Sequence, residues 1–159
     1  MADSFVVSTA MLKCTMGSST STLTVLPVRT VFMAGMPMGN ISDHKPLLNI
    51  APFGMCRSLV NPVVAAATAA NLGRLQPMPC IPNTPMPWIP GKPDTLIKGQ
   101  PALLKSCTCP CMWAGIISIT DDGQHGVGCT DVIKQPRVTQ SPTAFAHKEL
   151  PKMTDLSGD

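Results

Sequence analysis

Proline and glycine interrupt this chain along its whole length: 17 prolines and 12 glycines stand among 159 residues. Proline removes a backbone donor and glycine favours turns, so long helices cannot dominate the fold. Hydrophobic residues make up 44% of the chain and charged residues only 13%, which is enough apolar material to bury a core and excludes a disordered chain. Aromatic residues are scarce, at 4%. We therefore expect one compact, mainly β domain of short strands.

Several segments carry strand or helix patterns. Strands are expected over residues 5–12, 18–26, 28–33, 95–98 and 115–120, because these stretches are rich in β-branched residues or alternate in polarity. One short helix is expected at about residues 61–72, since Asn61 is a good N-cap, Pro62 suits the first helical position and Gly73 can end it.

The remaining segments lack a regular period. Residues 76–93 contain seven prolines and are expected to form an ordered, extended wrap held by Trp88 and Ile89. From about Lys134 the sequence becomes polar and aperiodic. The expected organisation is a domain over residues 1–133 and a polar tail over residues 134–159.

One internal repeat stands out. Residues 31–38 and 95–102 share the pattern of a strand, a glycine, any residue, a proline and a small or apolar residue, at a constant offset of 64. A candidate metal ligand follows each copy, His44 after the first and the group Cys107, Cys109 and Cys111 after the second. Two copies of one hairpin would bring such ligands to one place.

Cysteine dominates the reactive side chains. Seven cysteines cannot all pair within one chain, and thiols in a reducing compartment more often bind metal or act in catalysis than form disulfides. No C-x-x-C motif is present, so buried free thiols are an equally good explanation at this point. The candidate zinc ligands, in chain order, are Cys14, His44, Cys56, Cys80, Cys107, Cys109, Cys111, His125 and Cys129.

Recognisable enzyme signatures are absent from the sequence. Asp43 and His44 with Cys56 could form a thiol hydrolase site, but their flanks match no familiar signature. The run from Cys107 to Cys111 lacks the helix-start C-x-x-C of thiol redox proteins. There is no G-x-S-x-G, H-E-x-x-H or phosphate-binding glycine loop. We expect no enzymatic activity.

The charge pattern and the first residues exclude other classes. The net charge is only +3, and the 12 lysines and arginines are scattered singly, which argues against nucleic-acid binding. Residues 1–7 do not form a secretory signal, and no apolar stretch approaches the ~20 residues of a transmembrane helix. These features predict a protein that is made in the cytoplasm.

A family resemblance emerges from motifs taken in order between about residues 8 and 120. They include Leu12-Lys-Cys14-Thr-Met-Gly17, Asp43-His44-Lys-Pro46, Asn49-Ile-Ala-Pro-Phe-Gly-Met-Cys56, Pro77-Met-Pro-Cys80, Pro101-Ala102-Leu103 and Cys111-Met-Trp-Ala-Gly115. On these motifs the chain resembles the PAAR-like spike-tip proteins, specifically a PAAR-like family labelled as a domain of unknown function. The resemblance implies a small, cone-shaped β-prism held together by a structural zinc ion.

The resemblance also implies the ligands. PAAR domains hold zinc with three histidines and one cysteine, and the matching positions here are Cys14, His44, Cys56 and Cys111. This Cys₃His set is chemically suitable for Zn²⁺. Cys80, Cys109 and Cys107 remain alternatives, because Cys80 lies in a family-like motif and the other two lie beside Cys111.

The function implied is that of a non-enzymatic tip in a type VI secretion system or a related contractile injection system. Such a tip is assembled in the bacterial cytoplasm, where it caps a homotrimeric VgrG-like spike, one tip per trimer. It is then exported at the end of the spike, with effectors or adaptors, and makes transient contact with the target membrane. Two alternatives remain: an effector or adaptor that uses the PAAR-like cone as a delivery module, and a small zinc or thiol protein. The tail is too short for a toxin domain.

Overall fold

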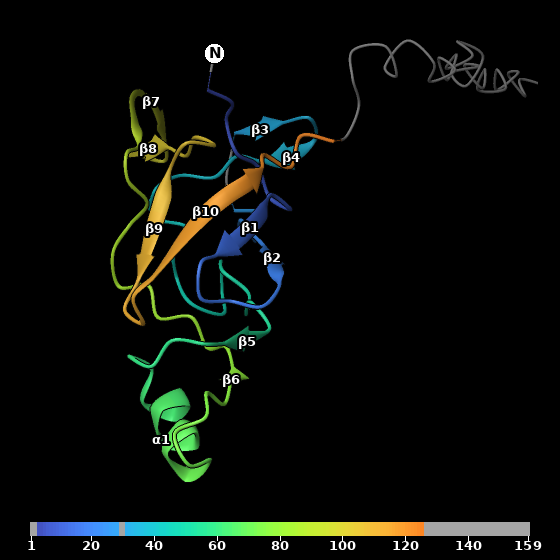
Figure 1. The fold of residues 1–159 in the computed structure, drawn as a ribbon. Helices are drawn as coiled ribbons and strands as arrows, with labels where there is room; N and C mark the ends of the chain where they lie inside the picture. Colours follow the sequence, from blue (N-terminus) through green and yellow to red (C-terminus); the bar gives the residue numbers. More distant parts are fainter. Residues whose placement is uncertain (1–2, 29–30, 126–159) are drawn as a thin grey trace, which may run out of the picture. The chain divides into compact units, whose positions relative to one another are not determined.

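The structure is a computed structural model that describes residues 3–28 and 31–125. All of these residues belong to one compact unit, Met1–Gly128. Figure 1 shows short strands joined by long irregular segments, and one short helix. Within these residues, the expectation of a mainly β fold with a single short helix is confirmed, and the sheets are small.

The largest sheet has four antiparallel strands in the order β2-β1-β10-β9. Strand β10 (Gly115–Asp121) pairs with both β1 (Met11–Cys14) and β9 (Thr108–Cys111), and β2 (Thr20–Thr22) lies at the edge. Leu12 on β1 and Ile117 on β10 are fully buried. These side chains place the sheet against the main core, in which six cysteines are also buried.

Two hairpins reproduce the sequence repeat. One joins β3 (Phe32–Met33) to β4 (Met36–Pro37), and the other joins β7 (Lys92–Ile97) to β8 (Gln100–Ala102). Each turn has two residues with positive φ, at 52° and 77° for Ala34 and Gly35 and at 54° and 77° for Lys98 and Gly99. This is the turn that matches the twist of two antiparallel strands. The predicted repeat is therefore a structural repeat.

Three segments that lie beside these hairpins form a closed ring of backbone hydrogen bonds. The N–H of Val6 donates to Leu103 O at 3.0 Å, that of Leu103 to Gly39 O at 3.0 Å, and that of Gly39 to Val6 O at 2.9 Å. A second ring of bonds joins the same three segments in the opposite order: Ser8 N donates to Pro37 O at 2.9 Å, Ile41 N to Pro101 O at 3.1 Å, and Lys105 N to Ser4 O at 2.9 Å.

These bonds give residues 4–8, 37–41 and 101–105 an internal threefold relation. Equivalent positions are 33 residues apart between the first and second segments and 64 residues apart between the second and third. When each residue is replaced by its equivalent in the next segment, with the third returning to the first, every bond maps onto another bond. The single-residue bridges Phe5 to Leu104, Val7 to Met38 and Asn40 to Ala102 follow the same rule. A small apolar cluster of Val7, Met38, Ile97 and Ala102 packs beside them. We call these three segments with the two hairpins the hairpin end.

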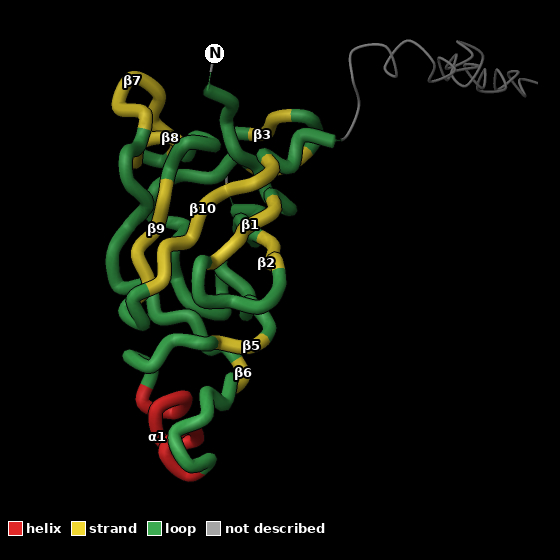
Figure 2. Tube along the Cα trace, viewed as in Figure 1, coloured by secondary structure: helices red, strands yellow, loops and turns green. Residues whose placement is uncertain are grey.

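The other end of this unit is built from β5 (Met55–Cys56), β6 (Met78–Pro79) and helix α1 (Pro62–Ala70), as Figure 2 shows. Strands β5 and β6 pair with each other, and α1 lies in the loop between them. Asn61 caps the helix by accepting from the N–H of Val63 at 3.1 Å. The predicted helix and its cap are confirmed, and the helix ends two residues before the predicted position.

Several predicted elements are shorter than expected. Only the last two residues of the segment 5–12 belong to a strand, and 18–26 contributes only β2. Within 76–93, Trp88 is buried as predicted, but Ile89 is half exposed at 50% and is not an anchor. The predicted boundary at residues 133 and 134 lies outside the described residues. In the part of the chain that is described, no helix has the length and apolar character to cross a bilayer.

Candidate metal centre

Four cysteines from four separate segments gather where the large sheet meets β5 and β6. Cys14, Cys56 and Cys111 are the last residues of β1, β5 and β9, and Cys80 directly follows β6. Gly17, just after β1, bridges to Cys56, and the N–H of Cys80 donates to Gly54 O at 2.7 Å. All four side chains are buried.

The four thiols interact electrostatically. Burial raises the pKa of the Cys14 thiol above its usual value, and the charges of Cys111 and Cys56 raise it further. Burial also raises the pKa of Cys80, with additional contributions from Cys56, Cys14 and Cys111. Both thiols are therefore protonated at neutral pH, and a metal ion bound here would displace their protons.

The turn that follows Cys14 is suited to hold a thiolate. The backbone N–H groups of Met16 and Gly17 hydrogen-bond to the Cys14 sulfur and lower its pKa, against the larger effect of burial. Donors of this kind stabilise the anionic form of a ligand. A thiolate at this position would therefore have two partners in addition to a metal ion.

Gly115 leaves the space that the Cys14 sulfur occupies. A Cβ at residue 115 would lie 2.8 Å from Cys14 Sγ and 3.7 Å from Cys111 Cβ. Such a short contact cannot be accommodated without a shift of the sulfur. The close approach of β1 to the start of β10 therefore depends on a residue without a side chain.

The donor set fits a thiophilic ion such as Zn²⁺, because four cysteines form a closed structural site. As the side chains stand, however, no group of three or more Cys, His, Asp or Glu within residues 3–28 and 31–125 is arranged to hold a metal ion. Coordination would require the four thiols to turn toward a common point.

A family model described as "Domain of unknown function (DUF4280)" matches residues 6–124. The chain belongs to this family. No curated protein and no solved structure matches it. The match begins within the first ring segment and ends just after β10, so it covers both the hairpin end and the four clustered cysteines of this DUF4280 domain.

His44 belongs to the Cys₃His set that the resemblance implies, and its Nδ1 lies 2.9 Å from Thr84 O. A histidine that binds a metal through one ring nitrogen commonly bonds a backbone carbonyl through the other, so this contact is compatible with the implied role. Cys80, an alternative in the sequence, interacts electrostatically with Cys14, Cys56 and Cys111. The clustered set is therefore Cys14, Cys56, Cys80 and Cys111, which we call the cysteine cluster.

The thiol hydrolase arrangement of Asp43, His44 and Cys56 is not assembled in the DUF4280 domain. A carboxylate oxygen of Asp43 accepts from the N–H of Asn40 at 2.9 Å, and its carbonyl accepts from Trp88 Nε1 at 2.9 Å. His44 contacts Thr84, whereas Cys56 belongs to the cysteine cluster. These three residues serve separate local structures.

The other two described cysteines are bonded elsewhere. The Cys107 thiol donates to Pro90 O, and its sulfur accepts from the N–H of Leu104 at 3.4 Å. The Cys109 thiol donates to Met86 O at 3.4 Å, and burial raises its pKa to about 12. A thiol with so high a pKa is a poor nucleophile at neutral pH, which argues against a redox role for Cys109. Cys129 lies outside the described residues.

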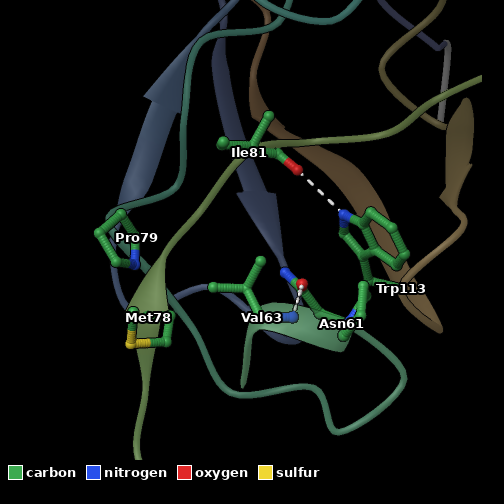
Figure 3. A pocket seen from close by; sticks show the side chains of 7 residues that line it. Asn61, Val63, Met78, Pro79, Ile81 and Trp113 are labelled. Atoms are coloured by element: carbon green, nitrogen blue, oxygen red, sulfur yellow. Dashed lines mark hydrogen bonds between the residues drawn. The ribbon is translucent and has the colours of Figure 1, made fainter. Parts of the chain in front are cut away.

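An apolar pocket of about 370 Å³ lies between α1 and β6. Its lining includes Val63, Met78, Ile81 and Trp113, as Figure 3 shows. Nε1 of Trp113 donates to Ile81 O at 3.0 Å, so this polar group is already bonded. No acid, base or nucleophile lines the pocket, and its chemistry suits an apolar contact. Sequence analysis could not predict this pocket, because residues 61–63, 78–79, 81 and 113 meet only in the fold.

Proposed function

We propose that this chain is a non-enzymatic tip that caps a homotrimeric VgrG-like spike of a contractile injection system, and that a zinc ion held by the cysteine cluster stabilises it. The proposal combines the resemblance to PAAR-like proteins with two features of the fold. The first is the threefold ring at the hairpin end, which carries the proposal. The second is the cysteine cluster.

The threefold ring supports a trimeric partner. A homotrimer offers the same chemical groups three times around its axis. A single chain can meet all three only if it repeats its own backbone geometry about that axis. Residues 4–8, 37–41 and 101–105 do so, through six hydrogen bonds of 2.9–3.1 Å that form two rings of three, one in each direction around the segments.

Equivalent exposed side chains extend the repeat to the surface. Phe32 on β3 and Leu96 on β7 occupy matching positions, 64 residues apart, and are 55% and 59% exposed. Large apolar side chains at such exposure favour contact with a partner. We assign them to the surface that covers the blunt end of the spike, where open strand edges otherwise invite aggregation.

Zinc would add a cross-link to the backbone bonds around β5 and β6. Strands β5 and β6 have two residues each, and such short pairs contribute little stability alone. Four thiolates on one ion would join β1, β5, β9 and the residue after β6. That connection would keep the tip rigid when the spike is driven forward.

The spike contact can be tested by co-expression and co-purification of the full chain with a VgrG-like trimer. We expect one chain per trimer, and loss of the complex in Phe32→Asp, Leu96→Asp and the double variant. Leu72→Asn, an exposed change on the loop after α1, is the matched control and should leave binding intact. A folded protein that binds no such trimer would contradict the proposal.

The ligand set can be tested by zinc analysis of protein purified without oxygen. We expect one zinc per chain in the natural protein and in His44→Gln and Cys109→Ser, and loss of zinc in Cys80→Ser and Cys111→Ser. Zinc that survives Cys80→Ser but is lost in His44→Gln would restore the Cys₃His set. Folded protein without any metal would overturn the zinc proposal while leaving the spike proposal open to its own test.

A further inference from the structure

The surface around helix α1 exposes almost only apolar side chains. We call residues 57–75 the α1 end. Leu72 is 94% exposed, Leu59 and Val60 are 59% and 58% exposed, and Val63 and Leu75 are about half exposed. The alanines at 66, 69 and 70 are also exposed.

Helix α1 is unusual because its outer face is not polar. A surface helix normally turns charged or polar residues to water. Here the buried side holds Val64 and Thr68, and Thr68 Oγ1 accepts from the N–H of Gln76 at 3.1 Å. The fold thus uses the only polar side chain within α1 internally and leaves the apolar residues outside.

The charges near this surface all have one sign. Arg57 and Arg74 are the only charged residues of the α1 end, and both are exposed. No aspartate or glutamate occurs between Asp43 and Asp94. This surface is apolar, carries positive charges and has no carboxylate nearby in sequence. It is therefore complementary to a partner with an apolar interior and a negatively charged surface.

We infer that the α1 end binds the surface of a bilayer that contains anionic phospholipids. The exposed leucines and valines would enter the boundary between headgroups and acyl chains, as the apolar faces of interfacial helices do. Arg57 and Arg74 would contact lipid phosphates, which the guanidinium group binds well. With nine residues, α1 is too short to span the bilayer, so the contact is at the surface.

The apolar pocket extends the same surface toward the sheet. Val63 belongs to both, and Ile81 on the pocket rim is 60% exposed. Trp113 lies across the pocket, with its ring nitrogen bonded to a carbonyl, as Figure 3 shows. Tryptophan favours membrane interfaces because its ring is large and amphipathic. The lipid-facing area therefore includes this side of α1.

Binding can be measured by co-sedimentation of the full chain with vesicles. We expect binding to vesicles of phosphatidylcholine mixed with phosphatidylglycerol, weaker binding to phosphatidylcholine alone, and weakening with added salt. Arg57→Gln and Arg74→Gln should each lower affinity about fivefold. Leu72→Asn should lower affinity about tenfold, because the favourable burial of the leucine side chain in the bilayer is lost. Asparagine tolerates the positive φ of 55° at this position.

Matched controls lie at the hairpin end. Leu96→Asn and Lys98→Gln change an exposed leucine and an exposed cation there, and both should bind vesicles like the natural protein. Absence of binding, or equal losses in Leu96→Asn and Leu72→Asn, would overturn the inference. Self-association without lipid that Leu72→Asn abolishes would also overturn it, in favour of a second copy of this chain.

The inference does not depend on the proposed spike or on zinc. Vesicle binding is measured on the chain alone, with and without added zinc, whereas the spike test measures a protein complex. Leu72→Asn should disturb lipid binding and leave the spike complex intact. Conversely, Leu96→Asp should disrupt the spike complex, whereas Leu96→Asn should leave vesicle binding intact. Failure of one proposal can thus be distinguished from failure of the other.

Discussion

The hairpin end and the cysteine cluster solve the same problem in different ways. Both hold together chain segments that are far apart in sequence. At the hairpin end, residues 4–8, 37–41 and 101–105 are joined by two rings of backbone hydrogen bonds beside an apolar cluster. Around the cysteine cluster, the strands β5 and β6 have two residues each, and the buried side chains that meet there include four thiols.

This difference indicates where the domain depends on a ligand. Backbone rings and apolar packing need nothing beyond the chain itself. Four adjacent thiols contribute packing as small apolar groups, but they connect their segments only when a metal ion joins them. We therefore expect stability at the hairpin end to be intrinsic, and stability near the cysteine cluster to depend on metal. The following predictions test this contrast.

The largest effect should come from removal of metal. A ligand at about a thousand times its dissociation constant stabilises a protein by about 4 kcal/mol, which corresponds to a fall in Tm of roughly 10–20 °C on its removal from a domain of this size. After chelation, hydrogen exchange should accelerate strongly at residues 53–57 and 78–80. Exchange of the ring amides, such as those of Val6, Gly39 and Leu103, should change much less.

Mass spectrometry of exchanged peptides can separate these regions. Cys80→Ser should reproduce the chelated pattern without chelator, and Cys109→Ser should not. A uniform acceleration over both ends would show that the domain unfolds as one unit and that the contrast between the ends is wrong. No change on chelation would show that the cluster contributes only as buried thiols.

The second effect concerns Gly115. In Gly115→Ala the new Cβ would lie 2.8 Å from Cys14 Sγ, so the sulfur must move. Crowding of this kind typically costs about 1–3 kcal/mol. We expect weaker zinc affinity by competition with a chromophoric chelator, and a loss of stability that is larger with zinc than without it. Unchanged zinc affinity would place Cys14 outside the coordination sphere.

The sequence could predict elements whose signal is local. The cap at Asn61, the pairing potential of residues 115–120 and the hairpin repeat at offset 64 are all written in short stretches, and the structure confirms each. The third member of the ring could not be found in this way. Val6, Gly39 and Leu103 share a backbone position but have unrelated side chains, so only hydrogen bonds reveal their equivalence.

The candidate site shows the same limit. Cys14, Cys56 and Cys111 were matched through motifs, but the choice between His44 and Cys80 depends on how the chain returns after α1. Pairing of β6 with β5 carries Cys80 to the cluster. His44 Nδ1 lies 2.9 Å from Thr84 O, a partner that the sequence does not indicate. Neither pairing has a signature in the residues themselves.

A third prediction probes the hairpin end. Asn40 is 1% exposed, its Nδ2 donates to Ile97 O at 2.9 Å, and its Oδ1 accepts from Ser42 N at 3.0 Å. Asn40→Ala leaves a buried carbonyl and a buried amide without these partners, which costs about 1–3 kcal/mol. Denaturant unfolding should show this loss equally with and without zinc. A loss that appears only with zinc would link the two ends.

The smallest effect tests whether the two hairpins are equivalent. Ala34 and Lys98 have φ values of 52° and 54°, in the left-handed region that costs a residue with a Cβ roughly 1 kcal/mol or more. Glycine removes this cost but gains freedom in the unfolded chain, which offsets part of the benefit. Ala34→Gly and Lys98→Gly should therefore each raise the free energy of unfolding by less than about 1 kcal/mol. Ala34→Val should lower it, since a β-branched residue fits this region poorly.

Equal gains in the two glycine variants, independent of zinc, are expected if both turns serve one repeated structure. A gain at one turn and a loss at the other would mean that the two turns have different tertiary contacts despite their matching φ values. The repeat would then be limited to backbone conformation.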